Sequence, residues 1–376
     1  MFREAGTPGA KLDCRLTKTK KRPLDSAKAM IIRERDPLNL EMPFGTLDGF
    51  TTPNEHFYVR CHFPIPQIDI RQWKLRIEGA IERPIEFTFD ELQQFPKRNL
   101  MATIECAGNS RVFLAPKVKG VQWEFGAVGN AEWTGFLLAD ILRRAGARSS
   151  AREVVLEGAD NGAIAEPLRP TGKVHFARSL PINKVMDDVI LAYEMNGEPL
   201  PASHGFPLRA VVPGWYGMAS VKWLRRIIVT EDLFQGYYQT VDYAYWQPGQ
   251  AGPELVPLSR MQVKAEIARP GVNEVVPSND NYVIRGAAWT SGAEIAKVEV
   301  TTNGGARWNE GKLIGDAGTD VWRLWEFDWR TPNAPGRYTL MARATDSRGH
   351  TQPDHHDANR GTYMINHCLP IEVEVR

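Results

Sequence analysis

A series of alternating apolar and polar segments after residue 255 restricts the fold of this chain more than any other sequence feature. Alternation with a period of two puts every second side chain on the same face of a strand. The segments, at intervals of roughly ten to fifteen positions, are MQVKAEIARP, NYVIRGAAWTSG, KVEVTTNGG, RLWEFDWRT, RYTLMARATDSRG and LPIEVEVR. Several short strands at this spacing are typical of an antiparallel β-sandwich. Asn303-Gly304, whose residues adopt positive φ readily, marks a tight hairpin turn.

The half of the chain before the sandwich mixes strand and helix patterns. Strands are predicted at residues 73–81, 85–92, 153–160 and 221–231, the second running into a helical turn. A helix is predicted over residues 134–147, with Thr134 as its N-cap and Gly146 at its end. The predicted fold class is therefore α+β, with a mixed domain followed by a sandwich.

The length of 376 residues is too great for one ordinary core, so at least two domains are expected. The first fifty residues lack a sustained period and suit an arm, with order expected from about Phe57. Residues 246–259, WQPGQAGPELVPLS, are rich in Pro and Gly and suit a linker. We expect an arm over 1–54, a mixed domain over 55–254 and a sandwich over 255–376.

Charge and composition exclude several classes of protein. Lys and Arg number 46 and Asp and Glu 45, so the formal net charge of +1 argues against a protein that lives on nucleic acid or anionic lipid. No stretch approaches the roughly 18 to 20 apolar residues of a membrane span, and no export signal is evident. We expect a cytoplasmic protein, or a periplasmic one if a leader has been removed.

The cysteines argue against several kinds of site. Cys14, Cys61, Cys106 and Cys368 form no CxxC pair, which excludes a zinc ribbon and a CxxCH haem attachment and disfavours a disulfide framework. The segment HHDANRGTYMINHC, residues 355–368, fits no common zinc spacing and is interpreted as a polar loop.

Two short segments combine reactive side chains with irregular backbone. In FYVRCHFPIP, Arg60 and His62 lie on one face if the chain is extended; the alternative is a strand end with a solvated Arg and a hydrogen-bonded His. In ATIECAGNSR, Cys106 follows a strand beside backbone N–H groups and Arg111, conditions that favour a thiolate and metal ligation. The alternative there is a buried, inert thiol.

A third segment suits an anion. In HGFPLRAVVPGWYGMASVKWLRR, residues 204–226, His204, Arg209 and Lys222 are interleaved with Gly and Pro. Side chains and free backbone donors of this kind can bind a phosphate. The alternative is a solvated loop followed by a strand.

Together these segments resemble the molybdenum-dependent sulfite oxidase family. The resemblance runs from about residue 55 to the end and is carried by FYVRCHFPIP, CAGNSR, VKGVQWEFGAVGNAEWTGFLLADIL and LAYEMNGEPLPASHGFPLRAVVPGWYGMASVKWL. It implies a mixed α/β molybdopterin-binding domain followed by an immunoglobulin-like dimerisation domain. Cys61, Ser110 and the segment 355–368 depart from the animal and plant members.

The resemblance implies a set of site residues. The thiolate that binds molybdenum falls on Cys106. The positions that bind the molybdopterin fall on Tyr58, Arg60, His62, Asp160, His204, Arg209, Ser220, Val221 and Lys222. The substrate pocket falls on Arg60, Arg111, Trp123, Tyr243 and Arg360. Guanidinium groups present paired donors that suit an oxyanion.

The function implied is oxygen-atom transfer to sulfite, with electrons passed to an external acceptor such as a cytochrome or oxygen, since no haem segment is found in this chain. A homodimer through residues 255–376 is implied too, and Trp289, Trp308, Trp322, Trp325 and Trp329 are more indoles than a small sandwich readily buries. Two alternatives remain: another oxyanion reaction such as nitrate reduction, and a non-catalytic binding protein with an adhesion-type sandwich. Cys106 argues against the second.

Overall fold

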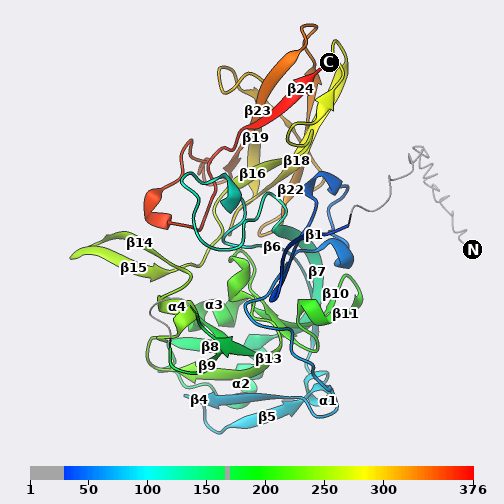
Figure 1. Cartoon of the computed structure of the whole chain (residues 1–376). Coiled ribbons are helices and arrows are strands. Elements are labelled where there is room, and N and C mark those ends of the chain that lie inside the picture. The colour runs from blue at the N-terminus through cyan, green and yellow to red at the C-terminus, as the bar shows by residue number, and fades with distance from the viewer. Residues whose placement is uncertain (1–28, 166–169) are drawn as a thin grey trace, which may run out of the picture.

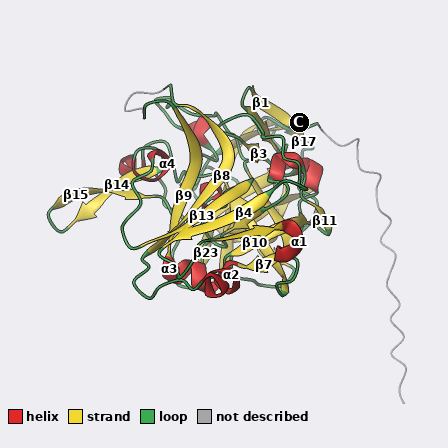
Figure 2. Cartoon of the chain, turned by 90° about the horizontal axis from the view of Figure 1, so that it is seen from below, coloured by secondary structure: helices red, strands yellow, loops and turns green. Residues whose placement is uncertain are grey.

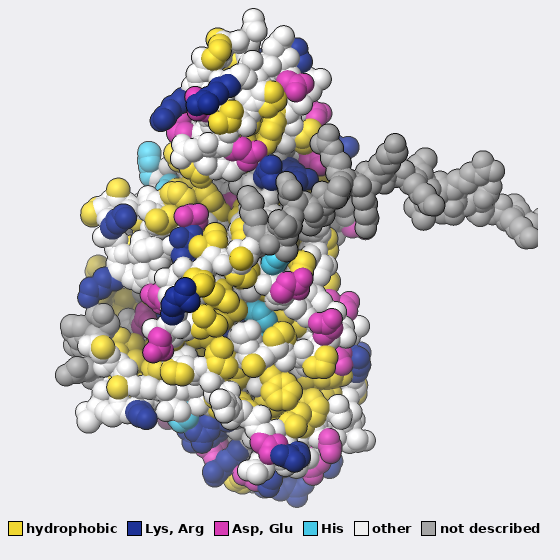
Figure 3. Space-filling model, turned by 45° about the vertical axis from the view of Figure 1, so that its right-hand side comes forward, with side chains coloured by type: hydrophobic (Ala, Val, Ile, Leu, Met, Phe, Trp, Pro, Cys, Tyr) yellow, Lys and Arg dark blue, Asp and Glu magenta, His cyan; other side chains and the backbone are white. Residues whose placement is uncertain are grey.

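The computed structural model describes residues 29–165 and 170–376, which form two bodies joined along the chain (Figure 1). Sheets built from β4 to β13 make the larger body, and strands β16 to β24 make the smaller one above it. On the face seen in Figure 3, basic and acidic side chains are interspersed, which agrees with the near-zero net charge. No helix in the described ranges has the length and apolar composition that a bilayer span requires.

One five-stranded sheet of the first domain has the strand order β5-β4-β13-β8-β9 (Figure 2). Its strands are β4 (Lys74–Gly79), β5 (Ile85–Thr88), β8 (Glu153–Ala163), β9 (Lys173–Pro181) and β13 (Leu224–Thr230). All neighbours are antiparallel except β13 and β4, which are parallel. Leu75 and Ile77 on β4 are fully buried while their neighbours are more exposed, as the alternating pattern predicts.

A second sheet carries the cysteine segment. It has the order β11-β10-β7-β6, with β12 also paired to β10. Its strands are β6 (Lys97–Glu105), β7 (Val128–Leu137), β10 (Ile190–Met195), β11 (Glu198–Pro199) and β12 (Arg209–Val211). Because β6 ends at Glu105, Cys106 is the first residue beyond a buried strand end.

Within residues 29–165 and 170–376 the helices are few and short, which confirms the α+β class. They are α1 (Phe89–Leu92), α2 (Leu138–Ala145), α3 (Ile182–Asp187) and α4 (Tyr237–Thr240). The predicted end of the helix at Gly146 is confirmed, since that residue has φ 71°. The predicted start at Thr134 is wrong, because Thr134 lies in β7 and pairs with β6 and β10.

The N-terminal part is more ordered than an arm. Strands β1 (Ile31–Arg35) and β2 (Leu38–Glu41) form a three-stranded sheet with β3 (Val59–Arg60). Glu41 is buried and accepts hydrogen bonds from the backbone of Gly126 at 2.7 Å and Glu124 at 3.1 Å. Order therefore begins before Phe57, since contacts with distant residues stabilise strands too short to show a period. Residues 1–28 of the expected arm lie outside the described residues.

The expected linker is a regular hairpin instead. Strands β14 (Ala244–Gly249) and β15 (Gly252–Pro257) pair in register and project from the body in Figure 1. Pro248 lies opposite Pro253, which is tolerated because both strands of a two-stranded ribbon are edges. The expected boundary between residues 254 and 255 falls inside β15.

The second domain consists of two packed sheets, as the alternating segments predict. Their strand orders are β16-β18-β22-β21 and β17-β24-β23-β19-β20. The six predicted segments overlap β16 (Lys264–Arg269), β18 (Asn281–Trp289), β19 (Ile295–Thr301), β22 (Arg323–Arg330), β23 (Gly336–Asp346) and β24 (Ile371–Val375), with β19 and β23 beginning one or two residues earlier than predicted. The shorter strands are β17 (Val275–Val276), β20 (Asn309–Glu310) and β21 (Lys312–Ile314).

Two details of this domain differ from the prediction. Positive φ falls on Gly304 and Gly305, at 66° and 92°, so the turn is one residue later than Asn303-Gly304. The expectation that surplus indoles face a partner is wrong, because four of the five tryptophans are buried within the chain: Trp289, Trp322, Trp325 and Trp329. Trp308 is half-buried, with the Arg343 guanidinium 4.3 Å from its ring centroid.

Candidate active site

A cleft of about 640 Å³, its open mouth included, lies in the first domain beside the end of β6. Eleven of the fourteen predicted site residues line it: Tyr58, Arg60, His62, Cys106, Asp160, His204, Arg209, Ser220, Val221, Lys222 and Tyr243. Arg111, Trp123 and Arg360 do not line it. Segments separated by up to 185 positions thus converge on one cavity.

Cys106 is held in a tight turn at the end of β6. Its backbone N–H donates to the Ala127 carbonyl at 2.8 Å, and its own carbonyl accepts from the Asn109 N–H at 2.9 Å. Burial raises the pKa of the Cys106 thiol, against the opposing pull of Arg111 and Arg60. The sequence predicted conditions that favour a thiolate, but burial outweighs the two cations. The thiol therefore keeps its proton at neutral pH, and a metal ion would have to displace that proton to bind there.

Arg60 provides a permanent positive charge in the cleft. Its guanidinium donates to the Cys61 carbonyl and to Asn39 Oδ1, the latter at 3.3 Å. Burial works to lower the pKa of Arg60, but the acidic groups around it, Glu34 among them, raise it above its usual value. A half-buried guanidinium that stays charged suits an anionic ligand.

A tyrosine and a histidine share a short hydrogen bond beside this charge. His62 Nε2 lies 2.7 Å from the Tyr243 hydroxyl. Burial, Arg60 and Lys222 together lower the pKa of His62 well below its usual range, so the imidazole is neutral. Burial also raises the pKa of Tyr243, whose hydroxyl keeps its proton. The pair can thus present an O–H or N–H donor to the cleft without carrying charge.

The backbone of Tyr243 is strained and supported from behind. Its φ of 53° is rare for a residue with a side chain, and its carbonyl accepts from the Leu258 N–H at 2.8 Å. Arg178, fully buried, donates to the carbonyls of Leu258, at 2.7 Å, and Tyr238. Arg178 could not be predicted as a supporting residue, because nothing in ARSLP distinguishes a buried arginine from a solvated one.

Four further lining residues form a polar group: Asp160, His204, Arg209 and Lys222. Asp160 Oδ1 is buried without a hydrogen-bond partner among the described residues, and burial raises the pKa of Asp160 to about 7. Arg209 donates to the carbonyls of His204 at 3.0 Å and Ser220 at 3.2 Å. Lys222 Nζ lies 2.8 Å from the Ser203 carbonyl. Burial, Lys222 and Arg209 lower the pKa of His204 to about 3.

This donor and acceptor set fits a large polar cofactor. An orphaned acceptor such as Asp160 Oδ1 needs a ligand N–H or O–H group, because an unsatisfied buried oxygen is costly. Arg209 and Lys222 suit a phosphate, and the Cys106 thiol suits a soft or borderline metal ion.

Arg111 lies behind the cysteine turn and is 5% exposed. Its Nε donates to Thr362, at 2.6 Å to Oγ1 and 3.1 Å to the carbonyl, and its Nη1 donates to the Val121 carbonyl at 2.8 Å. A Cβ on Gly108 would lie 2.1 Å from Arg111 Nη2, so any side chain there would displace the guanidinium. The Arg111 charge thus acts on Cys106 from outside the cleft lining.

Two other predicted residues lie farther out. Trp123 is fully buried and packs edge-on against Tyr58, with ring centroids 6.3 Å apart. Arg360, in a 3₁₀ turn of the second domain, donates to Asn366 Oδ1 at 2.9 Å and lies 3.6 Å from an Asp357 oxygen. Neither side chain reaches the cleft lining.

The second domain also contacts the site through residues 362–364, which the sequence analysis interpreted only as part of a polar loop. The Met364 N–H donates to the Ala107 carbonyl at 2.8 Å, directly beside Cys106. The Tyr363 ring lies 5.0 Å from that of Tyr243, and its hydroxyl donates to Asp242. No periodicity or spacing in HHDANRGTYMINHC indicated these contacts.

Comparisons with known proteins agree with this geometry. Residues 62–238 match the oxidoreductase molybdopterin binding domain, and residues 256–375 match the Mo-co oxidoreductase dimerisation domain. Chicken (Gallus gallus) sulfite oxidase is 34% identical, over 86% of this chain and 72% of its own length. Mouse (Mus musculus) mitochondrial sulfite oxidase is also 34% identical, and the chain spans 62% of its length.

Two further matches widen the range of relatives. NADH nitrate reductase 2 of Phaseolus vulgaris is 32% identical over 91% of this chain and 42% of its own length. The crystal structure of the sulfane dehydrogenase SoxCD from Paracoccus pantotrophus superposes with a TM-score of 0.78 and 28% identity, covering 90% of this chain and 85% of that one. The chain therefore belongs to the sulfite oxidase family of molybdopterin-binding oxidoreductases.

Proposed function

We propose that this chain oxidises sulfite to sulfate with a bound molybdopterin, according to SO₃²⁻ + H₂O → SO₄²⁻ + 2 H⁺ + 2 e⁻. The observation that carries the proposal is the convergence of Cys106, Arg60 and Tyr243 on one cleft. A metal-binding thiol, a permanent cation and a protonated hydroxyl are what an oxyanion reaction beside a metal requires.

Cys106 and the polar residues of the cleft would hold the cofactor. Cys106 Sγ would bind the metal, Asp160 would accept from N–H groups of the pterin, and Arg209 and Lys222 would bind its phosphate. The cofactor, when bound, would supply the oxygen-atom transfer and take up the two electrons. The electrons then pass to an external acceptor, for which we propose a cytochrome or oxygen.

The remaining residues would bind and orient the substrate. The Arg60 guanidinium would pair with sulfite oxygens and hold the anion beside Cys106. Tyr243 Oη, which keeps its proton, would donate to a substrate oxygen, while His62 Nε2 holds that hydroxyl in place at 2.7 Å. Arg111 would add positive potential from behind the Cys106 turn.

The test is a substrate panel on protein of measured molybdenum content. We expect sulfite to reduce ferricyanide with two equivalents per sulfate formed, and the Cys106→Ser variant to show no turnover. Nitrate reduction by reduced viologen without sulfite oxidation would favour the reaction of the nitrate reductase relatives. A sulfane-sulfur substrate belongs in the panel because of the SoxCD similarity. Protein without molybdenum after expression in a cofactor-competent host would favour a non-catalytic binding protein.

We also propose a homodimer through the second domain. This domain matches the Mo-co oxidoreductase dimerisation domain. Three valines on it are largely exposed, Val272 at 50%, Val275 at 52% and Val283 at 43%, and a partner subunit would remove them from water.

A further inference from the structure

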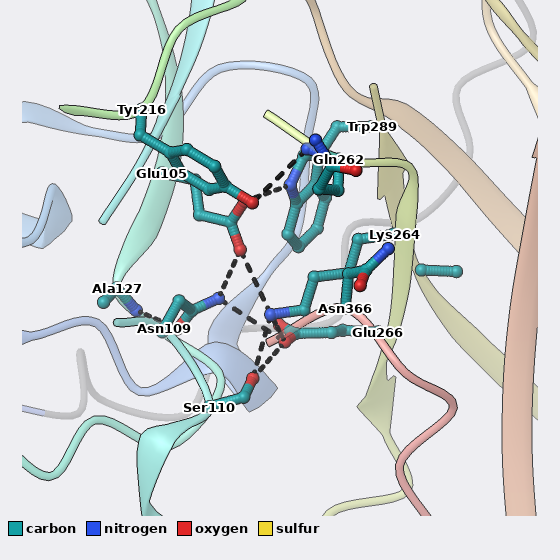
Figure 4. Close-up of polar contacts among 12 residues, drawn as sticks. Glu105, Asn109, Ser110, Ala127, Tyr216, Gln262, Lys264, Glu266, Trp289 and Asn366 are labelled. Carbon is teal, nitrogen blue, oxygen red and sulfur yellow. Dashed lines mark hydrogen bonds and ion pairs between the residues drawn. The ribbon is translucent and has the colours of Figure 1, made fainter. Parts of the chain in front are cut away.

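A buried polar cluster joins the two domains behind the Cys106 turn (Figure 4). Lys264 enters it from β16 of the second domain. Its Nζ lies 3.1 Å from Glu105 Oε1, 3.0 Å from Ser110 Oγ and 2.8 Å from Glu266 Oε1. The Lys264 cluster is defined as Glu105, Asn109, Ser110, Lys264, Glu266 and Trp289.

The other members complete the cluster on both sides. Ser110 Oγ donates to Glu266 Oε1 at 2.7 Å, and Trp289 Nε1 donates to Glu105 Oε2 at 2.9 Å. Asn109 Nδ2 donates to Glu105 Oε1 at 3.2 Å, while its Oδ1 accepts from the Ala127 N–H at 3.1 Å. Every member is at most 3% exposed. Buried charged groups stay paired, because leaving one without its partner in the protein interior is strongly destabilising.

The cluster holds the turn before and after the cysteine. Glu105 precedes Cys106 directly, and Asn109 and Ser110 follow it within the same turn. Ser110 has φ 73°, a conformation that a residue with a side chain adopts only when its surroundings impose it. The Met364 N–H binds the Ala107 carbonyl between them at 2.8 Å. The second domain therefore sets the path of the backbone that carries the thiol.

We propose that Lys264 is a positioning residue for Cys106: its ammonium group ties Glu105 and Ser110 together and so holds the thiol in the orientation that binds the metal. This inference rests on the proposed role of Cys106 as the metal ligand. Stability alone does not account for the cluster, because well-packed apolar residues often replace a buried ion pair without loss. A buried hydrogen-bonded network of this kind favours one conformation of the turn over others.

The decisive variant is Lys264→Met, which keeps the length of the side chain and removes the ammonium group. Ile284→Ala is the matched control. Ile284 is fully buried on β18, the strand that pairs with β16, and it is not one of the six residues of the Lys264 cluster. Both variants should lower the melting temperature. In the molybdenum-loaded protein, Lys264→Met should shift the Mo(V) electron paramagnetic resonance g-values and change the sulfur shell in X-ray absorption, while Ile284→Ala should leave both unchanged.

A second readout does not need the metal. In cofactor-free protein, Cys106 is nearly buried, so iodoacetamide should alkylate it slowly. Lys264→Met should make alkylation of the Cys106 peptide several-fold faster than in wild type and Ile284→Ala. If Lys264→Met does not fold, Ser110→Ala removes one link of the cluster without stranding a charge and should show the same change more weakly.

The outcomes separate the two proposals. Unchanged alkylation and unchanged spectra in Lys264→Met, relative to Ile284→Ala, would overturn the positioning role. Wild-type protein that binds molybdenum without a protein thiolate would instead refute the role of Cys106, and the alkylation rates would still decide whether Lys264 holds the turn.

Discussion

Asp160→Asn tests the least satisfied polar group of the site. Asp160 lies on β8 where the pairing with β9 is interrupted between Glu157 and Asn161, and it is 3% exposed. Its Oδ1 has no partner among the described residues, and burial raises its pKa from 3.8 to about 7. The folded cofactor-free protein should therefore bind a proton here that the unfolded chain releases.

The sign and size of the effect follow from proton linkage. Between pH 4 and pH 7 the folded state binds more protons than the unfolded state, so the free energy of unfolding falls as the pH rises. Each pH unit in this window contributes about 1.4 kcal/mol. The effect ends near the folded-state pKa of about 7, so raising the pH from 5 to 8 includes about two pH units of it. The free energy of unfolding of wild type should therefore fall by about 3 kcal/mol. Asn cannot ionise, so the variant should not lose that amount.

The assay is urea unfolding of cofactor-free wild type and Asp160→Asn at pH 5 and pH 8. Other buried groups with shifted pKa values, such as Glu266 and His204, contribute equally to both proteins and cancel in the difference. The loaded variant should also retain less molybdopterin, because an acceptor for the cofactor is weakened. Equal losses of stability in the two proteins between pH 5 and pH 8 would refute the reasoning.

Four further predictions follow from the site and the domains. Cys106→Ser should abolish sulfite oxidation with little change in melting temperature; retained turnover with an unchanged molybdenum edge would contradict it. Arg60→Gln should lower kcat/KM for sulfite by roughly 30- to several-thousand-fold, from about 2 to 5 kcal/mol, and weaken sulfate inhibition, while Arg111→Gln, outside the cleft lining, should have a smaller effect of the same sign. Arg178→Met should lower the free energy of unfolding by about 2 to 6 kcal/mol in urea titrations, because two buried carbonyls lose donors. Sedimentation at micromolar concentration should show a dimer, and a monomer there would count against the interface.

Local pattern was enough to predict the sandwich strands and most of the strands before them. An apolar residue at every second position needs no knowledge of the partner strand, so β16, β18 and β23 could be recognised directly. Helix α2 shows the limit of prediction from the local apolar pattern. The apolar residues before Leu138 fit a helical face, but pairing of residues 134–137 with β10 and β6 makes that stretch a strand.

The residues that line the cleft could be predicted only where the sequence resembles the sulfite oxidase family. Tyr58, Asp160 and Lys222 line the cleft together, although residue spacing alone gave no reason to join them. Arg178 was missed, because a buried arginine has no local signature and its role depends on carbonyls 60 and 80 positions away.

The Cys106 turn shows why the second domain could not be assigned a role in the site from its pattern. The alternation of β16 identifies Lys264 and Glu266 as neighbours on one face, and a charged face is usually a solvated one. In the structure that face is covered by the end of β6, so the two charges are buried against Glu105 and Ser110. Residues 362–364 bind Ala107 and Arg111 in the same turn. The domain that matches a dimerisation module thus also packs against the turn that carries the proposed metal ligand, Cys106.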